Sequence, residues 1–309
     1  MLLTFKIGMV EDVEDVIIRE LKDIEEFAKC EEIQRQAWGM EDIEIVPLHL
    51  LITVPKAGGI VIGAFNKKDG VLIGFCFGFI GHDGERFYLH SHMNAVIPEK
   101  QNKGIGRLLK LKQRECTLQR GLNLIKWTFD PLEGLNANLN FRKLGVISRT
   151  YIRNCYGEMR DKRNIGLETD RLLVEWWIKS KRVEERIKGN FPNYSLEKLL
   201  SKNASIANET MPIKPNFRKI TKINTDLTSE TILIEIPENI QKIKATNMKL
   251  ARDWRLKTRE LFETYFRKGY VAIDFLSEKI DDQRRNFYIL SKKLVLGNED
   301  IPRNFIERS

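Results

Sequence analysis

A six-residue stretch, Gln101 to Gly106, has the residue types and the spacing needed to hold an anion. The string "QNKGIG" follows an apolar, strand-like stretch and precedes "GRLLKLKQRECTLQR", a helix-forming run. Glycine lets a backbone approach a ligand closely, and the start of a helix leaves N–H groups unpaired at the positive end of the helix dipole. Lys103 and Arg107 add positive charge beside it. The pattern therefore predicts a cradle for a phosphate or a pyrophosphate.

Two better-known phosphate-binding loops fit this sequence less well. A P-loop requires G-x-x-x-x-G-K-[ST], and no such string occurs. A dinucleotide-binding loop requires a third glycine three residues after Gly106, where Leu109 stands, and strands in a β-α-β order. Both alternatives are disfavoured.

Candidate groups for proton transfer lie close to this turn in the sequence. His90 and His92 alternate on the strand-like stretch that leads to it, so both side chains are expected on one face of the sheet. Histidine has the pKa of a base that works near neutral pH. The alternative is that one or both are structural, packed or hydrogen-bonded residues. The acidic loop "GMEDIEIVPLH" adds Glu44, whose carboxylate is expected either to act as a base through water or to be a solvated loop residue.

The first 180 residues predict alternating helices and strands around a mostly antiparallel sheet, which is an α+β fold. Apolar residues at helical spacing and runs rich in β-branched and aromatic residues give the order α-α-β-β-β-α-β-α-β-β. The helices are expected at residues 20–38, 47–54, 106–120 and 136–145, and the strands at residues 59–66, 70–80, 86–97, 122–130, 150–159 and 170–178.

The sequence also predicts how the chain is divided. We expect a first domain at residues 1–185, a polar linker or wrapping arm at 186–227, and a basic C-terminal α/β region at 228–309. This last region is expected to hold a strand at 231–236, one long helix at 240–268 and two further strands. The strings "AVIPEKQ" and "IEIPENIQ" resemble each other, which suggests a degenerate half-repeat.

Charge and composition limit the classes of protein that this chain can represent. The net charge is +9, and residues 181–309 carry +8 of it, so this part is expected either to attract anions or to be a solvated basic face. The chain is 42% hydrophobic and 31% charged, as in soluble globular proteins, and it has no run of 18 apolar residues. The N-terminus turns acidic where a signal peptide would be apolar, which predicts a cytoplasmic protein without a membrane partner. The four cysteines are scattered and suggest reduced thiols, with no metal site.

The glycine turn and its surroundings resemble the Gcn5-related N-acetyltransferase (GNAT) superfamily. The superfamily motif [RQ]-x-x-G-x-[GA] lies between a strand and a helix, as "QNKGIG" does here. "LIKWTFDP" stands where the next strand is expected, and "NANLNFRKLGV" resembles the helix that ends in "LGF" in that superfamily. The resemblance covers roughly residues 20–180 and is closest to a prokaryotic acetyltransferase-like branch.

The resemblance implies a site for acetyl-CoA, or another acyl-CoA, as co-substrate, and no metal. The pyrophosphate is expected on the turn, the pantetheine arm along the preceding strand, and an asparagine of the later helix near that arm. The residues implied are Met93, Ala95, Val96, Gln101, Asn102, Lys103, Gly104, Ile105, Gly106, Arg107, Asn136 and Asn138. For either asparagine, capping of the helix is the alternative. In such enzymes an amine attacks the thioester directly, so the protein orients the reactants and handles protons.

The sequence departs from the superfamily pattern at one position. Many members have a tyrosine four residues before the glycine of "LGF", where it protonates the leaving thiolate, but this chain has Phe141. Tyr151, Tyr156 or water is expected to replace it, unless the site is not catalytic.

Two functions follow from these observations. The first is an acyl-CoA-dependent N-acyltransferase that transfers acetyl to a primary amine of a small molecule or a protein. The alternative is a non-catalytic module of the same fold that binds acyl-CoA or nucleic acid. Nucleic acid is the less favoured partner, because the basic C-terminal region lacks a helix-turn-helix or RNA-binding signature.

Overall fold

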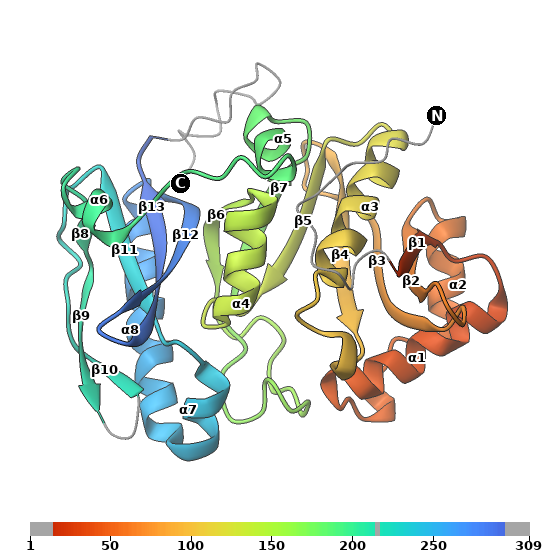
Figure 1. Cartoon of the computed structure of the whole chain (residues 1–309), viewed down its shortest axis with the longest axis horizontal. Helices are drawn as coiled ribbons and strands as arrows, with labels where there is room; N and C mark the ends of the chain where they lie inside the picture. Colours follow the sequence, from red (N-terminus) through yellow and green to blue (C-terminus); the bar gives the residue numbers. More distant parts are fainter. Residues whose placement is uncertain (1–14, 214–216, 294–309) are drawn as a thin grey trace. The chain divides into compact units, whose positions relative to one another are not determined.

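The computed structural model describes residues 15–213 and 217–293, and the chain divides into two compact units (Figure 1). The first unit runs to Trp127 and includes Arg160–Arg163, and the second comprises Thr128–Met159 and the chain from Asn164 onward. Each unit is described by itself below. The boundary between them differs from the domain boundaries that we expected near residues 185 and 227, and those domains stay predictions.

The first unit contains a mixed sheet with the strand order β1-β2-β3-β4-β5. The strands β1 to β4 are antiparallel neighbours, and β5 runs parallel to β4. Its elements are β1 (Val16–Glu20), α1 (Ile24–Trp38), the 3₁₀ turn η2 (Asp42–Glu44), α2 (Leu48–Lys56), β2 (Ile60–Asn66), β3 (Leu72–His82), β4 (Phe87–Val96), the 3₁₀ turn η3 (Pro98–Lys100), α3 (Ile105–Gln119) and β5 (Leu124–Phe129), whose last two residues belong to the second unit. The predicted α+β class is confirmed, and β1 is the strand that the sequence did not predict.

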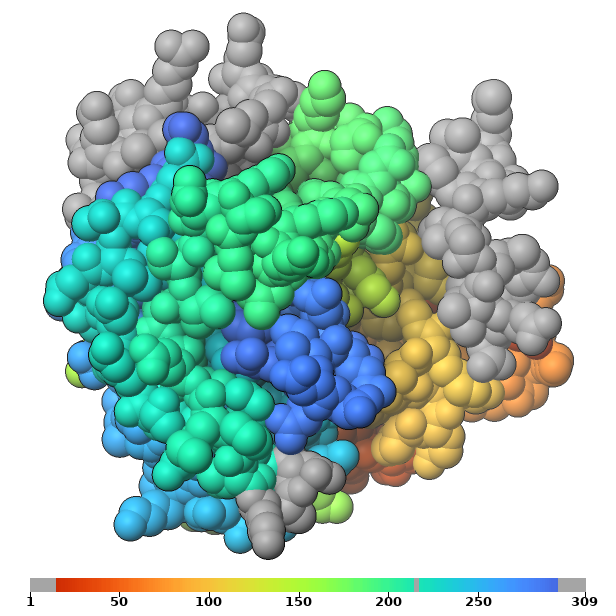
Figure 2. Space-filling model, turned by 60° about the vertical axis from the view of Figure 1, so that its left-hand side comes forward, coloured from red at the N-terminus to blue at the C-terminus, as the bar shows by residue number. Residues whose placement is uncertain are grey.

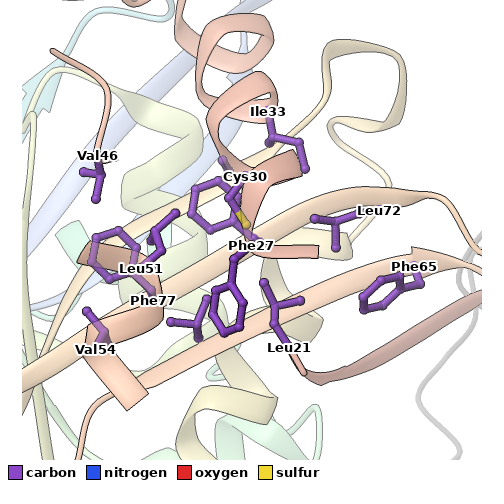
Figure 3. Close-up of a cluster of buried hydrophobic side chains, with 13 residues drawn as sticks. Leu21, Phe27, Cys30, Ile33, Val46, Leu51, Val54, Phe65, Leu72 and Phe77 are labelled. Atoms are coloured by element: carbon purple, nitrogen blue, oxygen red, sulfur yellow. The ribbon is translucent and has the colours of Figure 1, made fainter. Parts of the chain in front are cut away.

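Helices cover both faces of this sheet. On one face, α1 and α2 pack on alternate residues of β2 and β3, and Figure 3 shows these side chains converging between the helices and the strands. The core of this face consists of Leu21, Phe27, Cys30, Ile33, Val46, Leu51, Val54, Val61, Phe65, Leu72, Phe75, Phe77 and Ala95. Cys76 lies between Phe75 and Phe77 in sequence and faces the other way, where its thiol contacts the Leu109 carbonyl of α3 at 3.6 Å. The strand β4 is therefore held between two helical layers.

The second unit contains strands in the order β7-β6-β12-β13-β11-β8 and a separate hairpin of β9 and β10. Its strands are antiparallel except for the pair β11 and β8. Its elements are α4 (Gly134–Ala137), the π-helix η4 (Asn138–Leu144), β6 (Ile147–Ile152), β7 (Arg171–Trp177), α5 (Lys181–Ile187), α6 (Leu196–Leu200), β8 (Ser205–Ile206), β9 (Asn208–Ile213), β10 (Phe217–Ile223), β11 (Thr231–Ile236), α7 (Ile240–Thr246), α8 (Met248–Arg267), β12 (Val271–Ile280) and β13 (Gln283–Ser291).

Several elements of the second unit differ from the sequence prediction. The segment 186–227, expected to be irregular, contains α6, β8 and the β9–β10 hairpin. Figure 2 shows this region, in teal, beside the blue β12–β13 hairpin, and Arg218 donates to Gln283 between them at 2.9 Å. The helix expected at 240–268 is divided into α7 and α8 at Asn247, whose side chain accepts a hydrogen bond from the Leu250 amide and so begins a new helix. The strand expected at 150–159 ends at Ile152.

Among residues 15–213 and 217–293, no helix has both the length and the apolar character needed to cross a membrane. The same residues contain no group of three or more His, Cys, Asp or Glu side chains placed to hold a metal ion.

Candidate functional site

The predicted turn forms an uncapped helix start in the first unit. Gly104 has φ of +87°, which favours glycine, and it precedes α3 directly without a side-chain cap. Its carbonyl accepts hydrogen bonds from the amides of Arg107 and Leu108 at 3.0 and 3.2 Å, which closes the first turn of the helix. In the described part of the chain, the N–H groups of Gly104, Ile105 and Gly106 have no acceptor. A helix start with unpaired amides favours an anion.

Gly106 is the observation that separates this helix start from an ordinary one. A Cβ added there would meet its nearest atom, the Asn94 side-chain nitrogen, at 3.5 Å, which is an ordinary contact. Alanine would fit, and glycine within a helix costs about 0.5–1 kcal/mol relative to alanine. The fold itself therefore gives no reason for glycine at this position, whereas a ligand on the exposed amides would.

Two side-chain amides fix the turn to β4. Gln101 donates to the Val96 carbonyl at 2.9 Å, and Asn94 donates to the Gly106 carbonyl at 3.1 Å. Gln101 thus explains the first position of the Q-x-x-G-x-G pattern, since it holds the turn against the end of the strand. The role of Asn94 was not predicted, because a single polar residue in a strand gives no signal of this contact.

Burial affects the cation beside the turn. Arg107 is half-buried, and desolvation lowers the pKa of its guanidinium from the usual value. A guanidinium keeps its charge at neutral pH even so. The turn therefore combines unpaired N–H groups with a fixed positive charge.

The strand before the turn contains a β-bulge at His92. The β3–β4 register pairs Gly78 with Ser91 and Phe77 with Met93, so His92 is the extra residue. On its other side, β4 pairs with β5 at Leu89–Ile125 and His90–Lys126. The β4–β5 ladder ends at His90, two residues before the bulged His92, so the backbone from Met93 to Val96 has its ladder partners in β3.

His90 and His92 share a face of the sheet, as predicted. Their ring centroids are 6.1 Å apart, and both rings contact Phe79, at 5.0 and 5.8 Å. Desolvation, with smaller contributions from His92 and Lys110, lowers the pKa of His90 to about 4. Desolvation also lowers the pKa of His92, whose side chain keeps an exposed face. Both imidazoles are therefore neutral at pH 7.

Glu44 lies in η2 and is not joined to the histidines by a hydrogen bond. Its Oε1 accepts a hydrogen bond from the Arg160 amide at 3.3 Å. Its Oε2 is buried and has no hydrogen-bond partner among the described residues. Glu44 thus links η2 to the backbone at Arg160 through one carboxylate oxygen, and the other oxygen is unpaired among the described residues.

The tyrosines considered as proton donors belong to the second unit. Tyr151 donates to Asp170 at 2.7 Å, and desolvation together with that carboxylate raises the pKa of its hydroxyl. Arg259 also binds Asp170, so the tyrosine is part of a buried ionic network. Tyr156 is partly exposed, and its hydroxyl shares a hydrogen bond of 2.6 Å with that of Thr128. The Tyr151 hydroxyl thus serves a structural hydrogen bond to Asp170.

The remaining predicted residues of the second unit lie at the start of α4 and η4. Glu133, rather than an asparagine, precedes α4, and no side chain caps it. Within the described residues Asn136 and Asn138 make no hydrogen bond through their side chains, so the capping alternative is not observed. Phe141 is fully buried and packs edge-on against Tyr288 with ring centroids 5.5 Å apart. It presents no hydroxyl.

Comparison with known proteins gives similarities at the level of structure. No protein-family model matches the chain, and no curated protein matches it. The chain is similar to the structure of yncA from Salmonella typhimurium with its cofactor acetyl-CoA, at 18% identity and a TM-score of 0.44, over 53% of this chain and 95% of that one. It is also similar to the ribosomal-protein-S18-alanine N-acetyltransferase from Escherichia coli, at 16% identity and a TM-score of 0.42, over 53% and 94% of the two chains.

A third similar structure carries the superfamily name. It is an acetyltransferase of the GNAT family from Streptococcus pneumoniae, at 16% identity and a TM-score of 0.42, over 52% of this chain and 97% of that one. Each of these likenesses covers about half of this chain and more than nine-tenths of the other chain.

Proposed function

We propose that the chain is an acyl-CoA-dependent N-acyltransferase that transfers acetyl from acetyl-CoA to a primary amine. The observation that carries the proposal is the uncapped start of α3, where Gly104, Ile105 and Gly106 present amides without acceptors and Gly106 has no packing reason to be glycine. These groups suit the pyrophosphate of CoA. Arg107 and Lys103 supply further positive charge at the same place.

The strand β4 suits the pantetheine arm of the same molecule. Its backbone from Met93 to Val96 lies beyond the end of the β4–β5 ladder, so the β5-side edge of this stretch is the edge on which an extended arm would pair. Gln101 links the Val96 end of this stretch to the cradle. We therefore propose that the arm runs from the cradle along β4 toward the bulge.

We propose that one histidine of the pair His90 and His92 takes the proton from the attacking amine. His92 lies at the bulge and is exposed, whereas His90 is less exposed. Both are neutral at pH 7 because burial lowers their pKa values, so each has a free nitrogen lone pair. We propose His92 as the base, because the lower pKa of His90, about 4, leaves less driving force for proton uptake. Direct attack by the amine needs no protein nucleophile.

The first test is the binding of CoA. Titration of the full chain with acetyl-CoA, CoA and NADH is expected to raise the melting temperature with the two CoA species only. In Gly106→Asp the new carboxylate fits the first turn of a helix and repels phosphate, so the protein is expected to fold and to lose this rise. Gln119→Glu adds the same charge at the far end of α3 and is the matched control.

The second test is catalysis. A panel of primary amines, including peptides, is assayed for release of free CoA thiol in wild type and in His92→Gln. We expect release with at least one amine and a loss of about 10²-fold or more in the variant, with unchanged binding of acetyl-CoA. Tight binding of acetyl-CoA without release of thiol from any amine would instead favour the non-catalytic acyl-CoA-binding module. Failure of wild type to bind either CoA species would refute both.

A further inference from the structure

Lys110 of α3 is a buried amine that the proposed function has not used. Its side chain is 4% exposed, and its Nζ lies 2.6 Å from the Ser91 hydroxyl, 3.4 Å from Gln113 Oε1 and 3.8 Å from the ring centroid of Trp127. No carboxylate lies within salt-bridge distance of it among the described residues. A buried ammonium without a counter-ion costs several kcal/mol, so such a group needs a reason.

The position of Lys110 against the strands β4 and β5 suggests that reason. The β4–β5 ladder ends with the pair His90–Lys126, and Ser91 and Trp127 are the next residues of the two strands. Lys110 contacts both of these residues from the α3 side. Its ammonium thus bridges β4 and β5 at the first position where they no longer pair.

The proposed arm of acyl-CoA would end at this position. The cradle holds the phosphates near Val96, and the arm follows β4 back toward Ser91. It cannot continue past His90, because β5 occupies that edge of the strand. The thioester end is therefore expected at Ser91 and Trp127, which are the residues that Lys110 contacts.

The two faces of the sheet carry different titratable groups here. Ser91 and Lys110 lie on the α3 face, and His90 and His92 lie on the α1–α2 face. Of the other groups near Lys110, Cys76 of β3 is buried, and burial raises the pKa of its thiol to about 12, so it stays neutral. Burial lowers the pKa of Lys110 to about 7, close to that of an acid useful at neutral pH.

We propose that Lys110, with Ser91 as its hydrogen-bond partner, protonates the thiolate of CoA as it leaves. This inference rests on the proposed function and gives the chain a proton donor that Phe141 cannot be. The amine attacks the thioester carbonyl, a C–N bond forms and the C–S bond breaks. The proton lost by the amine passes to the histidine on one face, and the sulfur takes a proton from the Lys110 ammonium on the other. Solvent then reprotonates the lysine and deprotonates the histidine, so no further reactant is needed.

The test measures the ionisation of bound CoA rather than activity alone. A cation beside the sulfur favours the thiolate, whose ordinary pKa is about 8.5 for a cysteine thiol. On binding CoA to the full chain, the ultraviolet absorbance of the thiolate is expected to titrate at least one pH unit lower than for free CoA. In Lys110→Met it is expected at or above the free value, with CoA affinity changed less than about threefold, a shift of about 0.7 kcal/mol.

Activity gives a second readout with a matched control. Lys110→Met is expected to lower the rate of thiol release by about 10²-fold or more and to remove the fall in rate as pH rises through about 7. Lys112→Met, on the exposed side of the same helix where Lys112 pairs with Glu115, is expected to change neither. If Lys110→Met does not fold, the role of Lys110 is tested by Ser91→Ala and by the titration of CoA bound to wild type. A bound thiol that titrates in wild type at the same pH as free CoA overturns the proposal.

The outcomes separate this inference from the proposed function. If wild type binds CoA and releases thiol, while the bound thiol titrates identically in wild type and Lys110→Met, Lys110 is a structural residue and the inference is wrong although the function stands. If wild type does not bind CoA, the proposed function fails and the inference fails with it.

Discussion

Replacing Gly106 by alanine should stabilise the protein and weaken its binding of CoA. The added methyl group meets only the Asn94 side-chain nitrogen, at 3.5 Å, so the fold accepts it without strain. Alanine is also the better helix former, because glycine loses more backbone freedom on folding. In the protein without ligand, the substitution therefore adds the helix propensity of alanine and brings no steric cost.

The magnitude follows from these terms. The free energy of unfolding is expected to rise by about 0.5–1 kcal/mol, which corresponds to about 2 °C in melting temperature for a chain of this size. Binding should change in the opposite direction, because the methyl group occupies the surface through which the phosphate reaches the amides. Loss of one charge-assisted hydrogen bond, about 1.5–3 kcal/mol, corresponds to roughly 10- to 100-fold in Kd.

Urea unfolding and isothermal titration calorimetry with CoA measure the two quantities on the same samples. Lys112→Ala, a substitution on the exposed side of α3, is the control for a general effect of alanine on the helix, and it should leave Kd unchanged. A Gly106→Ala protein that binds CoA as tightly as wild type would refute the cradle. A destabilised one would show that the glycine serves the fold itself.

The other predictions concern the stability of each unit. Glu26 accepts two hydrogen bonds from Arg19, and this contact lowers the pKa of the carboxyl to about 2. Because the folded-state pKa lies below the unfolded one of about 4.5, the contribution of the pair is present above pH 4.5 and lost as the pH falls toward 2. Glu26→Gln should therefore cost about 1 kcal/mol at pH 7, discounted for partial exposure, and nothing near pH 2, as measured by urea unfolding at both values. In the second unit, Asp274 is fully buried and binds the buried guanidinium of Arg186. Asp274→Asn should destabilise by about 3–5 kcal/mol, whereas Arg186→Met combined with Asp274→Leu should lose less; equal losses in thermal unfolding would contradict this.

Much of the first unit follows from local sequence signals. The glycines at residues 39 and 104 mark a helix end and a helix start, and both have positive φ in the structure. Runs of apolar residues separated by short polar turns predicted β2, β3 and β4 correctly, because each hairpin is closed by nearby residues. The strand β1 was missed, since its five residues follow an acidic stretch and its position depends on pairing with β2, more than 40 residues away.

Other features depend on contacts that the sequence does not encode locally. From the sequence, the lysines of the basic helix α3 are expected to be solvent-exposed. In the structure, Lys110 is buried, and together with Gln113 and Thr117 it forms a buried polar stripe at helical spacing. The break between α7 and α8 occurs at Asn247, where a side-chain cap outweighs a continuous helical pattern. The β9–β10 hairpin lies in the segment expected to be an irregular linker or wrapping arm, because its strands alternate weakly between apolar and polar residues.

The bulge at His92 makes this histidine an insertion that the sheet does not require. Ser91 on the α3 face and Met93 on the α1–α2 face would alternate regularly if His92 were absent, and every pair between β3 and β4 would be kept. A one-residue deletion at this position should therefore preserve the fold, including the contact from Asn94 to Gly106. The bulge interrupts the regular pairing of β4 with β3 and adds the His92 side chain two residues beyond the end of the β4–β5 ladder.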